Sequence, residues 1–180
     1  AEQGYDRTDA CEMTTFVAYE FTASPNNANL HRNVIFRNEN VPQQPTTYLD
    51  ANTDMPFSLF QSLRSECLDS GAGCDVLTIP HNPNLSTGLM YENPATPAEA
   101  ADRALFEPLV EVYQHKASSG CYYNPLFGTG VGTSDEECGF EKTILSNLDL
   151  TAPMPLTTDP STLLNERSFV RNVLKDGMKL

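Results

Sequence analysis

Short apolar runs alternate with turn-forming residues at the start of the chain and predict two neighbouring strands. Residues 13–19 are rich in β-branched and aromatic side chains, and residues 31–36 form a second run of this kind. The segment 24–27, Ser-Pro-Asn-Asn, lies between them and is typical of a turn. The simplest geometry is an antiparallel hairpin. It brings His31, at the start of the second strand, back beside Glu20, at the end of the first.

Helices and strands alternate along the rest of the chain. Apolar residues recur at helical spacing over residues 57–67, and Pro97 in a first turn predicts a helix that runs to about residue 106. Strands are predicted at residues 75–79, which Pro80 ends, and at 109–113, and a last helix at 163–175. This alternation indicates an α/β fold with a largely parallel sheet. The pattern alone does not decide between a barrel and an open sheet.

The net charge of −13 excludes several classes of partner. Binding to nucleic acid needs clustered Lys and Arg, and adhesion to anionic membranes needs them as well. No apolar run is long enough to span a bilayer. The acidity suits a soluble, exported protein, although solubility alone also explains it. The N-terminus is polar and shows no signal peptide, so the chain reads as a mature protein or as a fragment of a longer one.

Four of the five cysteines bracket loops. Cys67 and Cys74 flank a turn-rich segment, and Cys121 and Cys138 flank a loop rich in Gly and Ser, whereas Cys11 is left over. Each pair is placed to close its loop as a disulfide, which implies an oxidising compartment. The alternative is a set of five reduced thiols in a cytosolic protein. The spacing lacks the tight Cys-x-x-Cys form that favours zinc.

Polar side chains with metal-binding atoms follow several predicted strands. In parallel α/β folds, ligands collect at the carboxyl ends of strands, where Glu20, His81 and His115 lie, and His31 joins them through the predicted hairpin. Imidazole nitrogen and carboxylate oxygen bind zinc, manganese or iron. Each residue also has an ordinary interpretation: a lone His after a strand is often a hydrogen-bonded loop residue, and Glu20 alone is compatible with a surface charge.

Seven segments span nearly the whole chain with a distinctive order of residues. They are residues 15–22, 29–37, 67–74, 79–86, 107–116, 135–141 and 169–175. In these segments the chain resembles a bacterial family catalogued as domain of unknown function 3604. That family is similar to the polymerase and histidinol phosphatase (PHP) superfamily. The resemblance implies a distorted βα barrel with long loops and a centre of two or three metal ions.

The resemblance also implies an activity and a set of residues. PHP-like enzymes hydrolyse phosphoesters or related sulfate and phosphonate esters with a metal-bound hydroxide. Their ligand pattern corresponds to Glu20, His31 and His81 of this chain. His115 and Lys116 follow the next strand and are candidates to face the site. The candidates for binding a small-molecule ester substrate are His115, Lys116, Arg32 and Asn82.

Two motifs of the PHP pattern, His-x-His before the first strand and Asp-x-His near the last, do not occur in this chain. Residues 1–180 therefore read as the central portion of one PHP-like hydrolase domain, inactive by itself and completed by the rest of its own chain or by a second copy. The expected location is periplasmic or secreted. The alternative, from another class, is a non-catalytic binding or structural domain that retains the scaffold.

Overall fold

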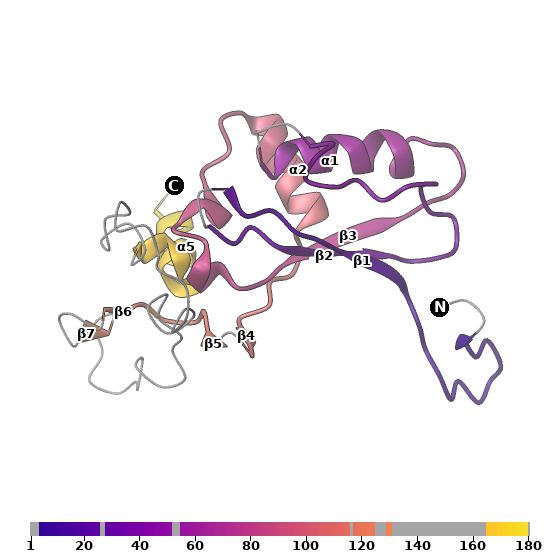
Figure 1. Ribbon diagram of the computed structural model, residues 1–180, viewed down its shortest axis with the longest axis horizontal. Coiled ribbons are helices and arrows are strands. Elements are labelled where there is room, and N and C mark those ends of the chain that lie inside the picture. The colour runs from indigo at the N-terminus through magenta and orange to yellow at the C-terminus, as the bar shows by residue number, and fades with distance from the viewer. Residues whose placement is uncertain are drawn as a thin grey trace. The chain divides into compact units, whose positions relative to one another are not determined.

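A computed structural model describes residues 4–25, 28–51, 55–115, 117–124, 129–130 and 165–179. Its main elements are the strands β1 (Val17–Phe21), β2 (Arg32–Phe36) and β3 (Val76–Pro80) and the helices α1 (Phe57–Leu63), α2 (Pro97–Phe106) and α5 (Val170–Gly177), as Figure 1 shows. Four two-residue strands, β4 (Tyr113–Gln114), β5 (Ala117–Ser118), β6 (Tyr123–Asn124) and β7 (Thr129–Gly130), pair as two small hairpins. Among these residues, no helix has the length and apolar character needed to cross a membrane.

The three longer strands form one antiparallel sheet in the order β1-β2-β3. In the first pair, Val17 lies opposite Phe36 and Phe21 opposite Arg32. In the second pair, the backbone N–H of Arg37 donates to the carbonyl of Asp75 at 2.9 Å, and that of His81 donates to the carbonyl of His31 at 3.2 Å. These two bonds fit a single antiparallel register, because residue numbers rise along β2 as they fall along β3.

This sheet differs from the largely parallel one that the alternation of elements indicated. A parallel neighbour needs a crossover that carries the chain back to the other end of the sheet. Here the chain leaves β2 at Arg37 and enters β3 from Asp75, directly beside it, so the connection begins and ends at the same end. The predicted hairpin of the first two strands is present. The PHP-type barrel stays a prediction.

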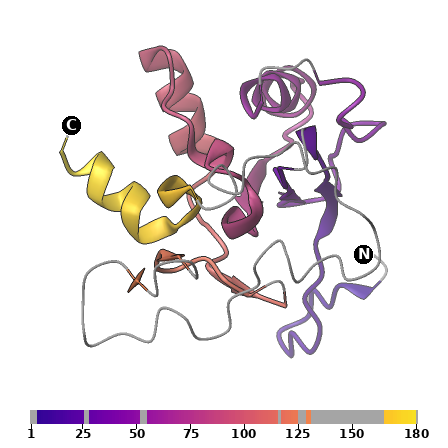
Figure 2. The ribbon, with the colours of Figure 1, turned by 60° about the vertical axis from the view of Figure 1, so that its left-hand side comes forward.

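One face of the sheet is buried beneath α1 and α2. Side chains alternate along β2 and β3 between buried and half-buried positions, as expected for strands covered mainly on one side. Figures 1 and 2 show α1 and α2 on this side of the strands, with α1 seen nearly end-on in Figure 2. Phe60 of α1 stacks on Phe106 of α2 with ring centroids 5.1 Å apart. The buried apolar side chains of this layer include Phe21, Val34, Phe36, Leu59, Leu63 and Val76.

The helix boundaries follow local chemistry. The hydroxyl of Thr96 accepts the N–H of Glu99 at 3.2 Å, and Pro97 opens α2, as predicted from the sequence. The predicted helix over 57–67 divides into α1 and a wider π-helical turn, Arg64–Leu68. The predicted strand at 109–113 is reduced to β4.

A buried ion pair lies within the same apolar layer. The side chains of Arg32 and Glu107 are 1% and 3% exposed, and Nε of Arg32 lies 2.5 Å from Oε1 of Glu107. The other carboxylate oxygen accepts from Nη1 of Arg103 at 3.0 Å. Two guanidinium groups on one carboxylate keep its charge compensated away from water.

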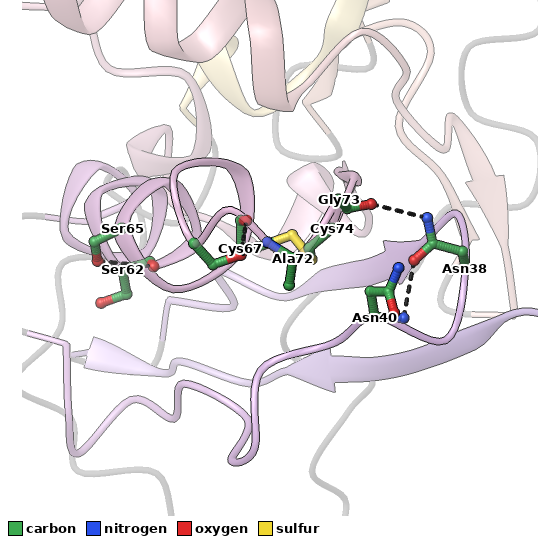
Figure 3. The surroundings of a disulfide bond; sticks show 9 residues. Asn38, Asn40, Ser62, Ser65, Cys67, Ala72, Gly73 and Cys74 are labelled. Atoms are coloured by element: carbon green, nitrogen blue, oxygen red, sulfur yellow. Dashed lines mark hydrogen bonds between the residues drawn. A yellow bond between two sulfur atoms is a disulfide. The ribbon is translucent and has the colours of Figure 1, made fainter.

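Cys67 and Cys74 form a disulfide, which confirms that predicted pairing (Figure 3). Beside it, the side-chain amide of Asn38 donates to the carbonyl of Gly73 at 3.1 Å and so joins the loop after β2 to the loop before β3. Cys11 forms no disulfide, as expected, and it is exposed. Cys121 is disulfide-bonded, and its predicted partner Cys138 lies outside the described residues.

Backbone contacts divide the chain into two compact units. The first contains the sheet with α1 and α2. The second contains the segments 23–31 and 80–93 together with the small hairpins and α5. In this second unit the N–H of Val170 donates to the carbonyl of Ser119 at 2.9 Å, and Nη2 of Arg167 donates to Oδ1 of Asn93 at 2.9 Å. These long-range bonds connect α5 and the turn before it to the rest of the unit.

Two matched substitutions test the buried ion pair. Glu107→Ala leaves Arg32 charged in the core and should lower the free energy of unfolding by about 3–5 kcal/mol. Asp75→Ala removes the partner of Arg37, whose side chain is 80% exposed, and should cost under about 1 kcal/mol. Urea denaturation of both variants measures the difference. Equal losses for the two variants would show that the buried pair contributes no more than a surface pair.

Candidate metal centre

The register of the sheet places three metal-binding side chains on one face. Glu20 of β1 lies opposite Asn33 of β2. His31 precedes Asn33 by two residues, so it projects to the same side as Glu20. His81, which follows β3, lies opposite His31 through the backbone bond between them. Side chains from the end of β1, the start of β2 and the end of β3 therefore lie at the same end of the sheet and on the same face.

These three side chains converge. Glu20, His31 and His81 each offer one ligand atom, and these atoms all lie within 4.8 Å of one another. Glu20 is exposed, whereas each histidine is 8% exposed. The two rings meet edge to face at 88°, with centroids 5.8 Å apart. The structure thus brings together the residues that the sequence singled out as ligands.

The donor set suits a divalent cation. Two imidazoles and a carboxylate are the ligands that zinc, manganese and iron accept, and catalytic zinc sites often use three protein ligands with a fourth position for water or substrate. A spacing within 4.8 Å lets one ion reach all three side chains. In the described part of the chain this is the single group of three or more His, Cys, Asp or Glu side chains close enough to hold an ion.

The comparisons with known proteins give a family. A family model described as "Protein of unknown function (DUF3604)" matches residues 1–180. The chain belongs to the DUF3604 family. This confirms the resemblance to that family, and the similarity to the PHP superfamily stays a prediction. No curated protein and no solved structure matches the chain.

Hydrogen bonds hold the His31 segment of this DUF3604 chain in place. The N–H of Leu30 donates to the carbonyl of Ala23 at 2.8 Å, which closes the turn between β1 and β2. Asn29 N–H donates to the carbonyl of Leu85 at 2.9 Å, and this bond joins the turn to the loop that follows His81. Within the turn, Oγ of Ser24 lies 3.4 Å from Nε2 of the His31 ring. The histidine is therefore held both by its backbone and at one ring nitrogen.

The loop after His81 is fixed by a left-handed residue and a buried hydroxyl. Asn82 has φ 54°, a conformation that Asn tolerates better than most residues, and its carbonyl accepts the N–H of Leu85 at 3.0 Å. Asn84 and Ser119 bond reciprocally: the hydroxyl donates to Oδ1 at 2.8 Å and accepts the backbone N–H at 3.2 Å. Asn82, a predicted substrate-binding candidate, is fully buried and occupies this turn.

The other candidates of the DUF3604 chain lie elsewhere. Arg32 is adjacent to His31 in sequence, so its side chain projects to the opposite face of the sheet, where Glu107 binds it. Arg32 therefore has a structural role, as a member of the buried ion pair, and does not face the converging ligands. His115 lies in an exposed turn between β4 and β5 and is not part of the converging group. Lys116 lies outside the described residues.

A cavity of about 200 Å³ also lies against β1. Its lining is mainly apolar and includes Val17 and Phe36, with Tyr19, Gln44 and Thr46 as polar members. Burial raises the pKa of Tyr19 to about 12, so its phenol stays neutral at physiological pH. This cavity contains no group that binds a metal or titrates near neutrality, and it offers less chemistry than the three converging ligands.

Sequence reasoning missed two contributors to the centre. Ser24 lay in a segment interpreted only as turn chemistry, yet a hydroxyl seven residues before a candidate ligand, across a tight turn, was a signal that could have been used. Ser119 had no such signal, because its contact with Asn84 joins residues 35 positions apart.

Zinc binding tests the group directly. The 180-residue protein should bind Zn²⁺, and His81→Ala should weaken that binding at least about tenfold, because removing a ligand costs at least as much as removing its supporting partner. Isothermal titration calorimetry measures both affinities. His115→Ala is the matched control, since it removes an exposed imidazole outside the group, and it should bind like the parent chain. Equal affinity for all three proteins would refute the assignment.

Proposed function

We propose that this chain supplies part of the metal centre of a hydrolase acting on phosphate esters or related sulfate and phosphonate esters. One observation carries the proposal: Glu20, His31 and His81 place a carboxylate and two imidazoles within 4.8 Å of one another. Catalytic metal centres use this mixture of ligands on a rigid support. The hydrogen-bonded strand ends of a sheet are such a support.

The residues of the chain have distinct tasks in this proposal. His31 and His81 are buried, and as neutral imidazoles they bind the cation on the side that faces the protein interior. Glu20 is exposed and balances the charge of the cation where substrate would approach. When bound, a divalent cation lowers the pKa of coordinated water towards 7 and offsets the negative charge that develops on the ester.

The PHP relationship belongs to the same proposal. The PHP pattern includes His-x-His and Asp-x-His motifs that residues 1–180 lack. We therefore expect the remaining ligands to come from another part of a longer chain or from a second copy. The three ligands held here are the middle part of that pattern, in the same order along the chain.

The disulfides support a location outside the reducing cytoplasm. Cys67 and Cys74 are bonded, and Cys121 is bonded as well. Structural disulfides persist in oxidising compartments. We propose that the protein is periplasmic or secreted, where an acidic chain stays soluble and an esterase can act on external substrates.

A non-catalytic binding or structural domain is the competing proposal. It is compatible with the same group of ligands, since three side chains can hold an ion without supporting turnover. The two proposals differ in whether ester hydrolysis depends on the three ligands.

Ester hydrolysis by the product of the complete gene distinguishes the two proposals. With added Zn²⁺ or Mn²⁺ it should hydrolyse p-nitrophenyl phosphate or p-nitrophenyl sulfate, and His81→Ala should remove most of that activity, at least about tenfold. The 180-residue chain alone should be inactive, and His115→Ala should leave the rate unchanged. A full rate from the 180 residues alone would contradict the missing-ligand account. An unchanged rate in His81→Ala would contradict the metal assignment.

A further inference from the structure

We infer that Ser24 is a positioning residue: it binds Nε2 of His31 and thereby directs Nδ1 of that ring to the cation. The inference rests on the proposed metal function, since it names which nitrogen of one ligand does the binding. It adds a residue outside the ligand set and a specific tautomer.

The geometry begins with the turn between β1 and β2. The backbone bond from Leu30 to Ala23 closes this turn and brings Ser24 next to the ring of His31, with Oγ 3.4 Å from Nε2. The histidine is 8% exposed, so its ring is held by protein on most sides, whereas the serine is exposed at the surface.

The chemistry of imidazole turns this contact into a choice of tautomer. A neutral ring has one N–H donor and one lone pair, and a metal takes the lone pair. If Nε2 carries the proton, its N–H donates to Oγ of Ser24, and the lone pair of Nδ1 is left for a cation. Ligating histidines commonly donate their second ring N–H to a neighbouring acceptor, which fixes the ring and its tautomer.

Backbone contacts help to place both histidines of the centre. His81 is placed by its backbone bond to His31 and by the turn at Asn82. His31 also has a contact to a side-chain hydroxyl at the ring itself. The removal of one hydroxyl should therefore change the orientation of one ligand while it leaves the other ligands and the sheet unaltered.

The first test measures the tautomer in the metal-free protein. Long-range ¹H–¹⁵N correlation spectra of the 180-residue chain should show His31 mainly as the Nε2–H tautomer at a pH where its ring is neutral. Ser24→Ala should shift the ring to a mixture of tautomers, and Ser24→Thr, which keeps the hydroxyl, should restore the parent spectrum. Thr22→Ala is the matched control, because it removes an exposed hydroxyl from the same turn region. An Nδ1–H tautomer in the parent chain would overturn the inference.

The second test uses bound metal. With ¹¹³Cd²⁺ as the probe, coupling to ¹⁵N of His31 should appear at Nδ1, and Ser24→Ala should weaken Zn²⁺ binding about tenfold, with Thr22→Ala and Ser24→Thr close to the parent. Coupling at Nε2, or unchanged affinity in Ser24→Ala, would refute the role of Ser24 while leaving the metal centre intact. If no metal binds and His81→Ala equals the parent, the proposed function fails, and the tautomer measurement still decides the contact between Ser24 and His31.

Discussion

The backbone hydrogen bond from His81 to His31 is the constraint on which the candidate centre depends. It continues the pairing of β2 and β3 beyond the last residues of the strands and places the two imidazoles opposite each other. Side chains alternate with a period of two along a strand, so a slip of one residue exchanges the faces of the whole strand. In β2 such a slip would move His31 into the apolar layer and bring Arg32 to the face of the sheet that carries Glu20 and His81. The buried ion pair of Arg32 and the outward direction of His31 are thus two results of one register.

Much of the centre could be predicted because its ligands lie at strand ends. The turn residues at 24–27 predicted a hairpin, and a hairpin alone brings His31 back to Glu20. His81 was chosen by a rule for parallel sheets, although the sheet is antiparallel. The choice still reached the right end because β1 and β3 run in the same direction on either side of β2. The end of β1, the start of β2 and the end of β3 then coincide.

Other features depend on contacts that a sequence does not display. Arg32 was a candidate for substrate binding, but its side chain lies on the face opposite His31, where it pairs with Glu107, 75 residues away. The hydroxyl of Ser119 likewise binds Asn84, 35 positions earlier in the sequence, and no local sequence pattern indicates this contact. The predicted strand at 109–113 contains residues of high strand propensity, yet only its last residue belongs to β4. Glu111 and Val112 each make a backbone bond, to Pro80 and Ser119, without forming a longer ladder.

The Cys67–Cys74 disulfide gives the sheet a second point of restraint, remote from the metal ligands. Asn38 binds the carbonyl of Gly73 just before Cys74, and Arg37 pairs with Asp75 just after it. The disulfide thus anchors the segment that enters β3 to the helical turn Arg64–Leu68, near one end of the β2–β3 ladder, while the other end of that ladder carries the histidines. Fraying, which normally begins at the ends of a ladder, is impeded where the covalent link lies. The backbone amides nearest the histidines should therefore be among the first of this ladder to exchange with solvent when no ion is bound. A bound cation would slow hydrogen exchange at these amides, at the end of the ladder opposite the disulfide.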